Sequence, residues 1–282
     1  MRFTRKDFMA SAAAFAVSPM LAADGRKIKT PLMLDTKRMA IHDGPGIRTT
    51  FFVKGCPLRC VWCHNPESIS VKPQTARFRH LCRSCEKCTM DETTCPTKAL
   101  KFYGKAMSTD DIVAKAMEDK AFYDESGGGV TLSGGEPLFF WEWAAEIFRA
   151  FKAKGLHTCL DTSLYAPQAA IDALLPVTDI WLADYKAEDD FLHKKFTKAS
   201  NRTIKKNLER LVAAKANIEV RCLSVPRCTD GEDLAARHSY LNSIGIPEKS
   251  IVNLEYNDYA RSKYLALGMK DTMPPKPKQK PE

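Results

Sequence analysis

The stretch KGCPLRCVWCHNPES, residues 54–68, places Cys56, Cys60 and Cys63 within eight positions. A structural zinc site takes four protein ligands, so three thiolates without a near fourth leave one coordination position open. His64 directly follows Cys63, and two adjacent residues are poorly placed to bind one tetrahedral ion. A four-iron cluster held by three cysteines leaves one iron free to bind a substrate. The stretch therefore predicts a catalytic iron–sulfur site.

The chain around this stretch has 282 residues, of which 44% are hydrophobic and 27% are charged. This length permits one or two domains, or a single α/β barrel with an insertion. Because the chain contains no run of about 20 apolar residues, we expect a soluble main body without a membrane span.

The net charge of +9 comes from 43 basic against 34 acidic residues, and part of the excess lies in the two ends. Nucleic acid is therefore not required as a partner. A basic surface favours an acidic protein or a phosphate-bearing ligand, whereas a solvated face is the commoner meaning of such an excess.

The N-terminus has the pattern of a signal peptide. Residues 1–23 combine a basic start, an alanine-rich apolar run and small residues before Asp24. The segment TRKDF resembles a twin-arginine signal with one arginine replaced by lysine, which would direct the protein to the periplasm. The alternative is that residues 1–30 form an extension on a cytosolic enzyme. At the other end, residues 273–282 are expected to be disordered.

Strand-like and helix-like segments alternate after about residue 30. Short apolar runs typical of strands occur at residues 49–55, 128–135, 157–162, 179–186, 218–225 and 250–256. Helical patterns separate them, at residues 108–126, 142–155, from 167 onward, 201–216 and 232–243. This alternation predicts an α/β fold with a parallel sheet, and the number of units suits an open or partial barrel.

Polar residues follow or close these apolar runs, at positions Ser133, Asp161, Asp184, Lys186 and Arg221. Enzymes of the βα-barrel type place their ligands at the carboxyl ends of the strands. The shared position of these residues therefore predicts one ligand site.

A second set of cysteines lies in a segment with little periodicity, residues 72–104. Cys82, Cys85, Cys88 and Cys95 read C-x2-C-x2-C-x6-C-P. About 35 residues cannot bury enough apolar area to fold unaided, so a metal-bound insertion is expected here. The three remaining cysteines are expected to be small buried hydrophobes, Cys159, Cys222 and Cys228.

A family resemblance follows from these motifs. Cys-x3-Cys-x2-Cys with an aromatic residue before the last cysteine resembles the radical S-adenosylmethionine (SAM) signature. The longer stretch IHDGPGIRTTFFVKGCPLRCVWCHNPE, residues 41–67, is similar to the glycyl-radical-enzyme activating enzymes, such as the pyruvate formate-lyase activating enzyme. The similarity spans about residues 32–268. It implies a partial (β/α)6-type radical SAM barrel over residues 31–272, with a small ferredoxin-like insertion at residues 72–104.

The resemblance also implies a reaction. The free iron of a 4Fe-4S cluster would chelate SAM, and one electron would break a carbon–sulfur bond to give methionine and a 5'-deoxyadenosyl radical. That radical would take a Cα hydrogen from a glycine of a partner glycyl radical enzyme. Flavodoxin or ferredoxin as electron donor, a monomeric state and a cytoplasmic location are further expectations from the family. The protein's own tasks would be to position the cofactor and exclude water.

Site residues are carried over by matching motifs. Cys56, Cys60 and Cys63 would hold the catalytic cluster, and Trp62 would lie beside the cofactor. In SGGEP, residues 133–137, Gly134 and Gly135 would let the backbone approach the methionine amino group, and Glu136 would accept from it. The remaining cofactor contacts would come from Asp161, Asp184, Lys186, Arg221 and Asn257.

Asn257 marks a departure from the family. Where the family commonly has Leu-Pro-Tyr-His after its last strand, this chain has NLEYND. Asparagine can donate and accept hydrogen bonds but cannot become charged. Cofactor affinity or rate is the property that this replacement would change.

A glycine-containing loop, residues 41–48, would help form the surface that meets the partner's glycine. The residues concerned are Asp43, Gly44, Pro45, Gly46 and Arg48. The alternative is that the two glycines merely shape a turn.

The second cysteine set resembles the ferredoxin-type insert of some activating enzymes, but its last gap is six residues rather than three and no further set of four is present. All four cysteines are therefore expected to hold one auxiliary 4Fe-4S cluster. Zinc is the alternative, because four thiolates also satisfy it.

Three other functions are compatible with parts of the sequence. They are a radical SAM enzyme acting on a small molecule or peptide, a non-catalytic iron–sulfur electron carrier, and a zinc module that binds nucleic acid. The carrier would not cleave SAM, and the zinc module would bind DNA or RNA in a salt-sensitive way.

Overall fold

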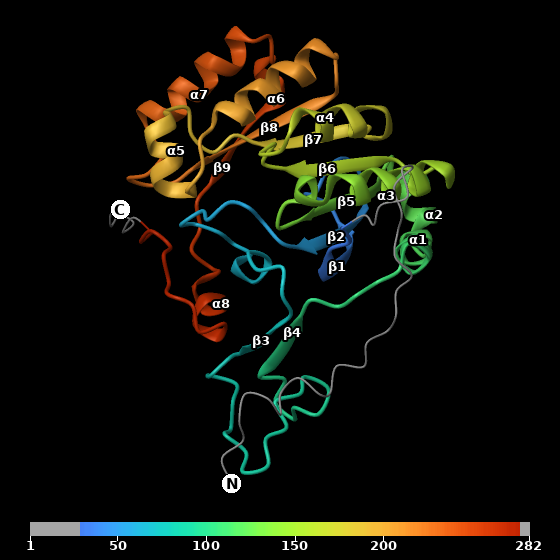
Figure 1. Ribbon diagram of the computed structural model, residues 1–282, viewed down its shortest axis with the longest axis vertical. Coiled ribbons are helices and arrows are strands. Elements are labelled where there is room, and N and C mark those ends of the chain that lie inside the picture. Colours follow the sequence, from blue (N-terminus) through green and yellow to red (C-terminus); the bar gives the residue numbers. More distant parts are fainter. Residues whose placement is uncertain (1–28, 277–282) are drawn as a thin grey trace.

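The computed structural model describes residues 29–276, which form a curved, mostly parallel sheet with helices along its outer side (Figure 1). Seven strands make up this sheet in the order β1-β2-β5-β6-β7-β8-β9. Their bounds are β1 (Leu32–Ala40), β2 (Arg48–Lys54), β5 (Gly129–Gly134), β6 (Thr158–Thr162), β7 (Ile180–Asp184), β8 (Ile218–Ser224) and β9 (Ile251–Glu255).

Six of the strands, β2 and β5 to β9, are parallel and adjacent in chain order, while β1 pairs antiparallel with β2 at one edge. The pairing within residues 29–276 does not join β9 back to β1 or β2, so the sheet is an open barrel. The predicted α/β fold with a parallel sheet is confirmed. The carboxyl ends of six strands consequently meet along one edge.

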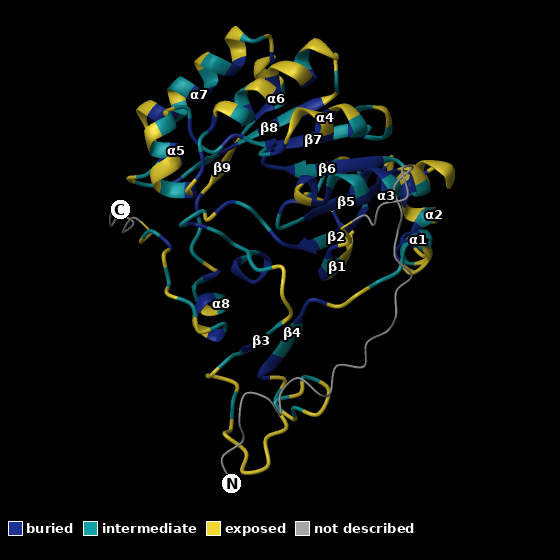
Figure 2. Ribbon diagram, viewed as in Figure 1, coloured by how far each residue is buried: buried dark blue, intermediate teal, exposed yellow. Residues whose placement is uncertain are grey.

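The helices connect successive parallel strands, except the last one, which follows β9. They are α1 (Thr109–Met117), α2 (Lys120–Ser126), α3 (Trp141–Ala153), α4 (Gln168–Leu174), α5 (Asp190–Thr197), α6 (Arg202–Ala213), α7 (Glu232–Ser243) and α8 (Arg261–Ala266). Short 3-10 turns are η2 (Pro66–Ser68), η3 (Pro137–Phe140), η4 (Leu175–Val177) and η5 (Glu248–Ser250). The main core lies between the sheet and these helices, and the central strands β2, β5 and β6 are buried along most of their length (Figure 2). Phe51, Leu132, Trp143 and Trp181 are among its largest members.

The insertion between β2 and α1 is built on an antiparallel hairpin, β3 (Gln74–Arg77) with β4 (Leu100–Tyr103). Ala76 and Tyr103 of this hairpin pack against Leu34 and Ala266, which fixes it to β1 and α8. The intervening residues 78–99 form turns and are largely exposed, at the end of the molecule that Figure 2 shows in yellow. The hairpin lies within residues 72–104, and the bounds of the insertion and its ferredoxin-like fold stay predictions.

Several elements differ from the sequence-based expectations. The strand β1 was not expected, because register shifts between Met33 and Asp35 and between Lys37 and Ala40 break its alternation of polar and apolar residues. The expected helix at residues 108–126 is two helices, α1 and α2, with the break at residues 118–119. Neither α5 nor α8 was expected from the sequence.

The expectation of disorder from residue 273 onward is wrong for residues 273 and 274. Met273 is buried, and the Pro274 carbonyl accepts hydrogen bonds from Tyr256 and Arg261, so both residues pack onto the folded body. The predicted signal-like segment, residues 1–23, lies outside the described residues. Among residues 29–276, no helix has the length and apolar character needed to span a bilayer.

Candidate active site

A pocket of about 420 Å³ opens where the parallel strands end. It brings together the three cysteines that follow β2 and the polar residues at the ends of β5, β6, β7 and β8. Its lining includes Cys56, Cys60, Cys63, Trp62, Gly134, Gly135, Asp161, Asp184, Lys186, Arg221 and Asn257. The site predicted from strand ends and the site predicted from the cysteines are thus one site.

The cluster loop, which we define as residues 56–67, carries the three cysteines in irregular backbone directly after β2. All three are half-buried free thiols. Burial raises the pKa of Cys56 and Cys60, and it raises the pKa of Cys63 to about 12. As thiolates in these surroundings they need a cation to stabilise their charge, which is the role of iron in a cluster.

Four charged side chains form one network on the pocket wall. Arg221 forms ion pairs with Asp161 and, at 3.3 Å, with Asp184. Lys186 donates to the second carboxylate oxygen of Asp184 at 3.0 Å, and the Ser133 hydroxyl donates to Asp161 at 2.6 Å. The charges of the two carboxylates and the two cations balance, so the network carries no net charge. Because Asp161, Asp184 and Arg221 lie on β6, β7 and β8, three strands hold the network in place.

The pKa values of the two carboxylates of this network are shifted in opposite directions. Burial is the main cause of the raised pKa of Asp161; the charge of Arg221 opposes it, and the nearby charge of Asp184 adds to it. Burial also acts on Asp184, but the charges of Lys186 and Arg221 outweigh it and lower its pKa. The pKa values of Lys186 and Arg221 are both raised by these carboxylates against the effect of burial. The two cations are therefore charged throughout the physiological range.

Gly134 and Gly135 border the pocket with their backbone, for a reason that the sequence did not reveal. A Cβ on Gly134, whose φ is +110°, would lie 2.5 Å from the Val53 nitrogen, and one on Gly135 would meet the Gly55 carbonyl oxygen. The amide of Gly135 also donates to the Val53 carbonyl at 2.8 Å. The end of β5 is packed so closely on the end of β2 that only glycine fits.

Glu136 does not have the predicted contact. Its side chain is fully buried, does not line the pocket, and accepts hydrogen bonds from the Leu138 amide at 3.0 Å and the Thr162 hydroxyl at 2.6 Å. The Ser163 amide donates to its second oxygen at 2.8 Å, and the Ser163 hydroxyl also donates there. Burial nevertheless raises its pKa. Glu136 therefore links the ends of β5 and β6 rather than accepting from a methionine amino group.

The loop at residues 41–47 lies apart from the pocket. It joins β1 to the amino end of β2, where the Ile47 carbonyl accepts from Gly129, so it is at the opposite edge of the sheet from the pocket. Arg48 is completely buried and donates to Thr131 Oγ1 at 2.7 Å and to the Pro45 carbonyl at 3.0 Å. It cannot contact a partner. The geometry agrees with the alternative reading, in which Gly44 (φ +117°) and Gly46 (φ +66°) shape a turn.

Trp62 and Asn257 line the pocket as predicted. The Trp62 ring is buried, and its centroid lies 6.0 Å from that of Phe196. The Asn257 side chain accepts from the Tyr259 amide at 3.3 Å, and the Asn257 carbonyl accepts from His64 Nε2 at 2.9 Å. The sequence analysis excluded His64 as a metal ligand and predicted no other role for it. In the structure, its ring links the cluster loop to the segment after β9.

Further lining residues were missed by the motifs. They are Leu58, Asn65, Ser68, Thr162, Ser163, Tyr185, Leu223, Leu254 and Glu255. Thr162 and Ser163 directly follow Asp161 in the LDTS stretch, which is the signal that could have identified them. Leu254 and Glu255 are exposed, so the pocket meets solvent at the end of β9.

The second cysteine set lies in the turns of the insertion. Arg77 donates to the Cys82 sulfur at 3.0 and 3.2 Å, and hydrogen bonds from the Ser84 backbone and from Arg77 lower the pKa of Cys82. Cys85 and Cys88 are exposed, and Cys95 is half-buried. Within residues 29–276, no three His, Cys, Asp or Glu side chains surround a position for one metal ion, and this holds for the three pocket cysteines too, each of which would bind a different iron of a cluster. The auxiliary ligand set therefore stays a prediction.

Comparison with known proteins gives the class of protein. The sequence matches the radical SAM superfamily over residues 50–236, well over half of the chain. The crystal structure of Streptococcus suis SuiB bound to the precursor peptide SuiA has the same fold, with a TM-score of 0.51 and 11% identity over 76% of this chain and 40% of that one. The chain is a radical SAM enzyme.

Relatives at higher identity narrow the class. The chain is 37% identical to the (2S)-3-sulfopropanediol dehydratase activating enzyme of Klebsiella oxytoca, covering 84% of this chain and 86% of that protein. It is 36% identical to the trans-4-hydroxy-L-proline dehydratase activating enzyme of Clostridioides difficile (83% and 87%) and 35% identical to the pyruvate formate-lyase 2-activating enzyme of Escherichia coli K12 (84% and 80%). The chain belongs to the glycyl-radical-enzyme activating enzymes, which confirms the family predicted from its motifs.

The family implies a 4Fe-4S cluster and SAM, and the pocket fits both. Three thiols from one loop enter it, with no fourth cysteine among its lining residues. Lys186 and Arg221 are charged groups suited to a carboxylate, and the backbone of Gly134 and Gly135 is exposed to a ligand without intervening side chains. The three thiols therefore suit the cluster, and the charged side chains and glycine backbone of the pocket suit SAM.

Proposed function

We propose that Cys56, Cys60 and Cys63 hold the catalytic 4Fe-4S cluster, and that SAM occupies the rest of the pocket. When bound, the cluster and SAM supply the reductive carbon–sulfur cleavage and the 5'-deoxyadenosyl radical that takes a Cα hydrogen from a glycine of the partner. One observation carries the proposal: the three thiols and the network of Asp161, Asp184, Lys186 and Arg221 line the same pocket.

The charged network orients the ligand. Asp184 and Asp161 fix Lys186 and Arg221 in place before any ligand arrives, so their donors need no reorganisation to bind a carboxylate. The lowered pKa of Asp184 keeps it ionised and able to accept from hydroxyl groups such as those of a ribose. Asn257, which lines the pocket opposite, supplies neutral donor and acceptor groups.

Apolar side chains exclude water from the reacting centre. Trp62 and Leu58 are buried at the pocket, and Leu223 lines it from the end of β8. A radical that can take hydrogen from many C–H bonds is confined by such walls, and one open side remains for the partner. Leu254 and Glu255 mark this side, so we expect the partner's glycine to enter at the end of β9 rather than at the loop of residues 41–47.

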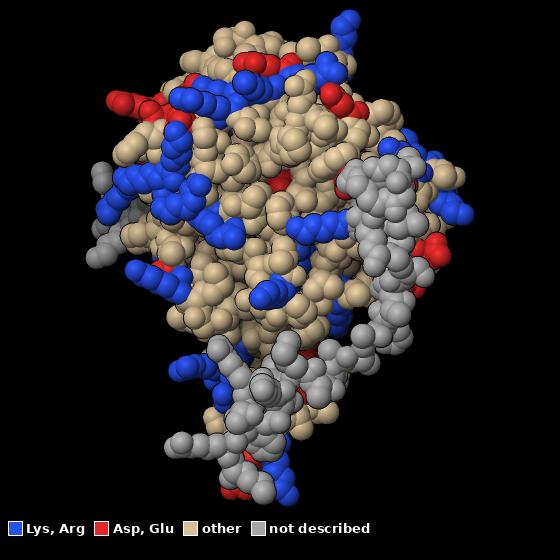
Figure 3. Space-filling model, viewed as in Figure 1, with Lys and Arg blue, Asp and Glu red and all other residues tan. Residues whose placement is uncertain are grey.

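The insertion supplies the second part of the proposal. Cys82, Cys85, Cys88 and Cys95 would hold an auxiliary 4Fe-4S cluster that passes electrons inward or stiffens a docking face. Lys and Arg side chains are prominent on the face of the molecule in Figure 3, in line with the net charge of +9. A reduced flavodoxin or ferredoxin, both acidic proteins, would be attracted to such a surface. The proposed enzyme acts as a monomer in the cytoplasm, and the alternative is export to the periplasm through residues 1–23.

The first experiment combines metal analysis with spectroscopy. Anaerobically purified and reconstituted protein is assayed for iron and sulfide per chain, and electron paramagnetic resonance spectra are recorded with and without SAM. A cluster signal that changes with SAM supports an open catalytic cluster, and about eight irons per chain supports the auxiliary one. If the spectrum of the reduced cluster does not change when SAM is added, the proposed ligand site is contradicted.

A second measurement addresses the partner. The reduced protein is mixed with a candidate glycyl radical enzyme and SAM, and the glycyl radical signal is compared with the methionine released. Radical formation on the partner supports the activating role. Methionine release without any partner radical would indicate that the candidate is not the substrate protein.

A further inference from the structure

A C-terminal segment, residues 256–274, lies against the cluster loop. It includes α8, and its sequence positions are about two hundred residues away from the cysteines that it contacts. Trp62 packs with Tyr256, Ala260, Tyr264 and Met273 of this segment in a small apolar cluster. The polar contacts described next reach the backbone of the loop itself.

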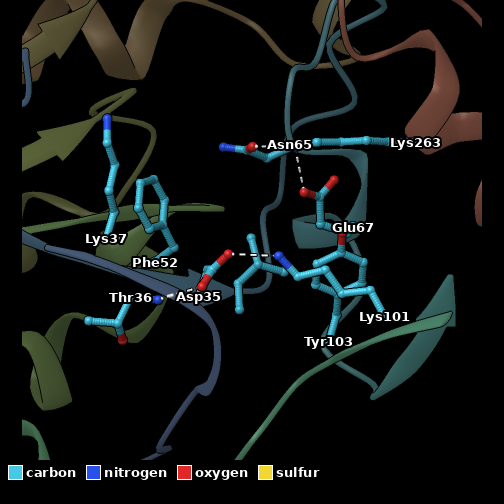
Figure 4. A pocket seen from close by; sticks show the side chains of 10 residues that line it. Asp35, Thr36, Lys37, Phe52, Asn65, Glu67, Lys101, Tyr103 and Lys263 are labelled. Carbon is cyan, nitrogen blue, oxygen red and sulfur yellow. Dashed lines mark hydrogen bonds and ion pairs between the residues drawn. The ribbon is translucent and has the colours of Figure 1, made fainter. Parts of the chain in front are cut away.

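Lys263 of α8 makes the largest number of these polar contacts. Its ammonium donates to the His64 carbonyl at 2.9 Å, to Asn65 Oδ1 at 3.2 Å and to Glu67 Oε1 at 2.7 Å. Figure 4 shows the Lys263 side chain reaching the loop at Asn65, with Glu67 beside it. All three donor sites of one ammonium are thus used on the residues that immediately follow Cys63.

Two neighbouring side chains extend the contact toward the cysteines. The Tyr264 hydroxyl donates to the Cys63 carbonyl at 3.1 Å, and the Thr272 hydroxyl donates to the Val61 carbonyl at 2.9 Å. On its other side, the loop is held by the end of α5, where Phe196 accepts from the Val61 amide at 3.0 Å. The cluster loop is therefore clamped between α5 and the C-terminal segment.

Lys263 also compensates the charge of the buried Glu67 carboxylate. Its side chain is only 4% exposed, and its second oxygen is buried without a hydrogen-bond partner. A pocket of about 330 Å³, lined by Glu67, Asn65 and Lys263 among others, lies beside this ion pair (Figure 4). Removing Lys263 would leave a buried carboxylate unpaired and would free the loop carbonyls at the same time. An experiment has to separate these two effects.

We propose that Lys263 is a positioning residue for the catalytic cluster: by donating to His64 and Asn65, it fixes the backbone that presents Cys63. This inference rests on the proposed function, because it concerns the residues that hold the cluster. Groups that orient metal ligands from outside are commonly as necessary as the ligands themselves. The role differs from that of the pocket residues, since Lys263 does not line the SAM pocket.

The test uses Lys263→Met and Lys263→Met/Glu67→Gln in the full chain. Hydrogen–deuterium exchange of residues 61–67 is measured before and after reconstitution, together with the rate of iron loss to a chelator. We expect faster exchange in both variants and iron loss accelerated roughly tenfold, the size of effect typical for groups that orient metal ligands. The double variant, which lacks the unpaired carboxylate, should regain thermal stability while keeping the fast exchange and iron loss.

Lys115→Met is the matched control, because it removes a lysine of α1 that forms an ion pair with the exposed Glu118 and does not contact the cluster loop. Wild-type exchange and iron retention in Lys263→Met, equal to those of the control, would overturn the proposal. So would recovery of iron retention in the double variant, because Lys263 would then serve only to neutralise Glu67. If the wild-type protein binds no iron, the proposed function fails, while the exchange measurement still decides whether Lys263 holds the loop.

Discussion

Three thiols with raised pKa values share a pocket with the charged side chains of Lys186 and Arg221, and in the proposed site each thiol would have a separate task. Every cysteine of the cluster loop would bind a different iron, so none can replace another. The remaining cysteines are not interchangeable with them, since Cys159 and Cys222 are buried away from the pocket lining. This separation makes single-residue substitutions informative.

Cys60→Ala is expected to abolish SAM cleavage while leaving a folded protein, because a cluster with three protein ligands cannot lose one thiolate. Methionine release by the reduced protein measures the effect, and circular dichroism reports the fold. Cys228→Ala is the control, because Cys228 is half-buried and does not line the pocket. Full cleavage activity in the Cys60 variant would contradict the open-iron site.

Asp119 gives a prediction that depends on pH. This side chain is buried at the break between α1 and α2, where it accepts from Arg38 Nε at 2.9 Å and from Thr49 at 2.7 Å. The hydrogen bond from Arg38 lowers its pKa. Because the pKa of the folded state is depressed, the stabilisation is complete above the unfolded value of about 4 and is lost as pH falls through the folded value.

Asp119→Asn is therefore expected to lower the free energy of unfolding at pH 7 by about 1.5–3 kcal/mol, the usual contribution of hydrogen bonds to a charged group. Urea unfolding of the iron-free chain at pH 7 and near pH 3 measures the difference between wild type and variant. The difference should shrink at the lower pH. An equal difference at both pH values would show that the Asp119 charge contributes nothing.

At the scale of elements, the parallel strands and most connecting helices could be predicted from the sequence. Their apolar runs and caps are local signals: Ser108 accepts from the Asp111 amide at the start of α1, and Gly155 follows α3 with a φ of +72°. The elements that were missed have fewer such signals, although Asp189 caps the start of α5 by accepting from the Leu192 amide. α8 is six residues long without a capping side chain, and α5 ends at Lys198 in the left-handed region, where glycine would be the usual marker.

The loop before β2 shows a second kind of feature that the sequence could not predict. Its glycines were recognised, but their purpose was not, because it depends on a neighbour far along the chain. A Cβ on Gly46 would lie 2.5 Å from the Gly128 nitrogen and 2.6 Å from the Ser126 carbonyl oxygen. The loop is therefore packed tightly against the turn that precedes β5, and it closes the amino end of the sheet beneath the pocket.

Gly46→Ala should consequently destabilise the protein far more than Gly127→Ala. Both glycines have a φ of +66°, but a Cβ on Gly127 meets nothing within 4 Å. The left-handed conformation alone costs about 1–2 kcal/mol for alanine, and the clash should add at least as much again for Gly46. Thermal unfolding of the two variants measures the difference, and equal midpoints would show that the close approach to Gly128 is not required.

At the scale of the whole molecule, the site depends on residues that the sequence keeps far apart. The motifs located the cysteines, Asp161, Asp184, Lys186 and Arg221, because each lies at the end of a recognisable strand. The contact of Lys263 with His64 could not be predicted, since no local pattern relates positions so distant. The same holds for Glu136 and Arg48, whose buried hydrogen bonds depend on how strands pack rather than on their order.

The shape of the molecule also separates two routes to the cluster. The pocket opens at the end of β9, while the β3–β4 hairpin extends away from the sheet at the lower end of the view in Figure 1. If the insertion carries an auxiliary cluster, it can serve electron entry or docking without touching SAM. The two activities of the enzyme, cofactor cleavage and partner activation, should then be separable by a substitution in the insertion.

Cys85→Ala tests this separation. Cys85 is exposed in the turns of the insertion and does not line the SAM pocket, so its loss leaves the three ligands of the catalytic cluster intact. With a chemical reductant, the variant should still release methionine, but the yield of glycyl radical on the partner should fall further than methionine release does. Both quantities are measured in one reaction, by chromatography and by electron paramagnetic resonance. Equal loss of both would mean that the insertion acts on the catalytic cluster itself, and unchanged values of both would leave Cys85 without a role in either step.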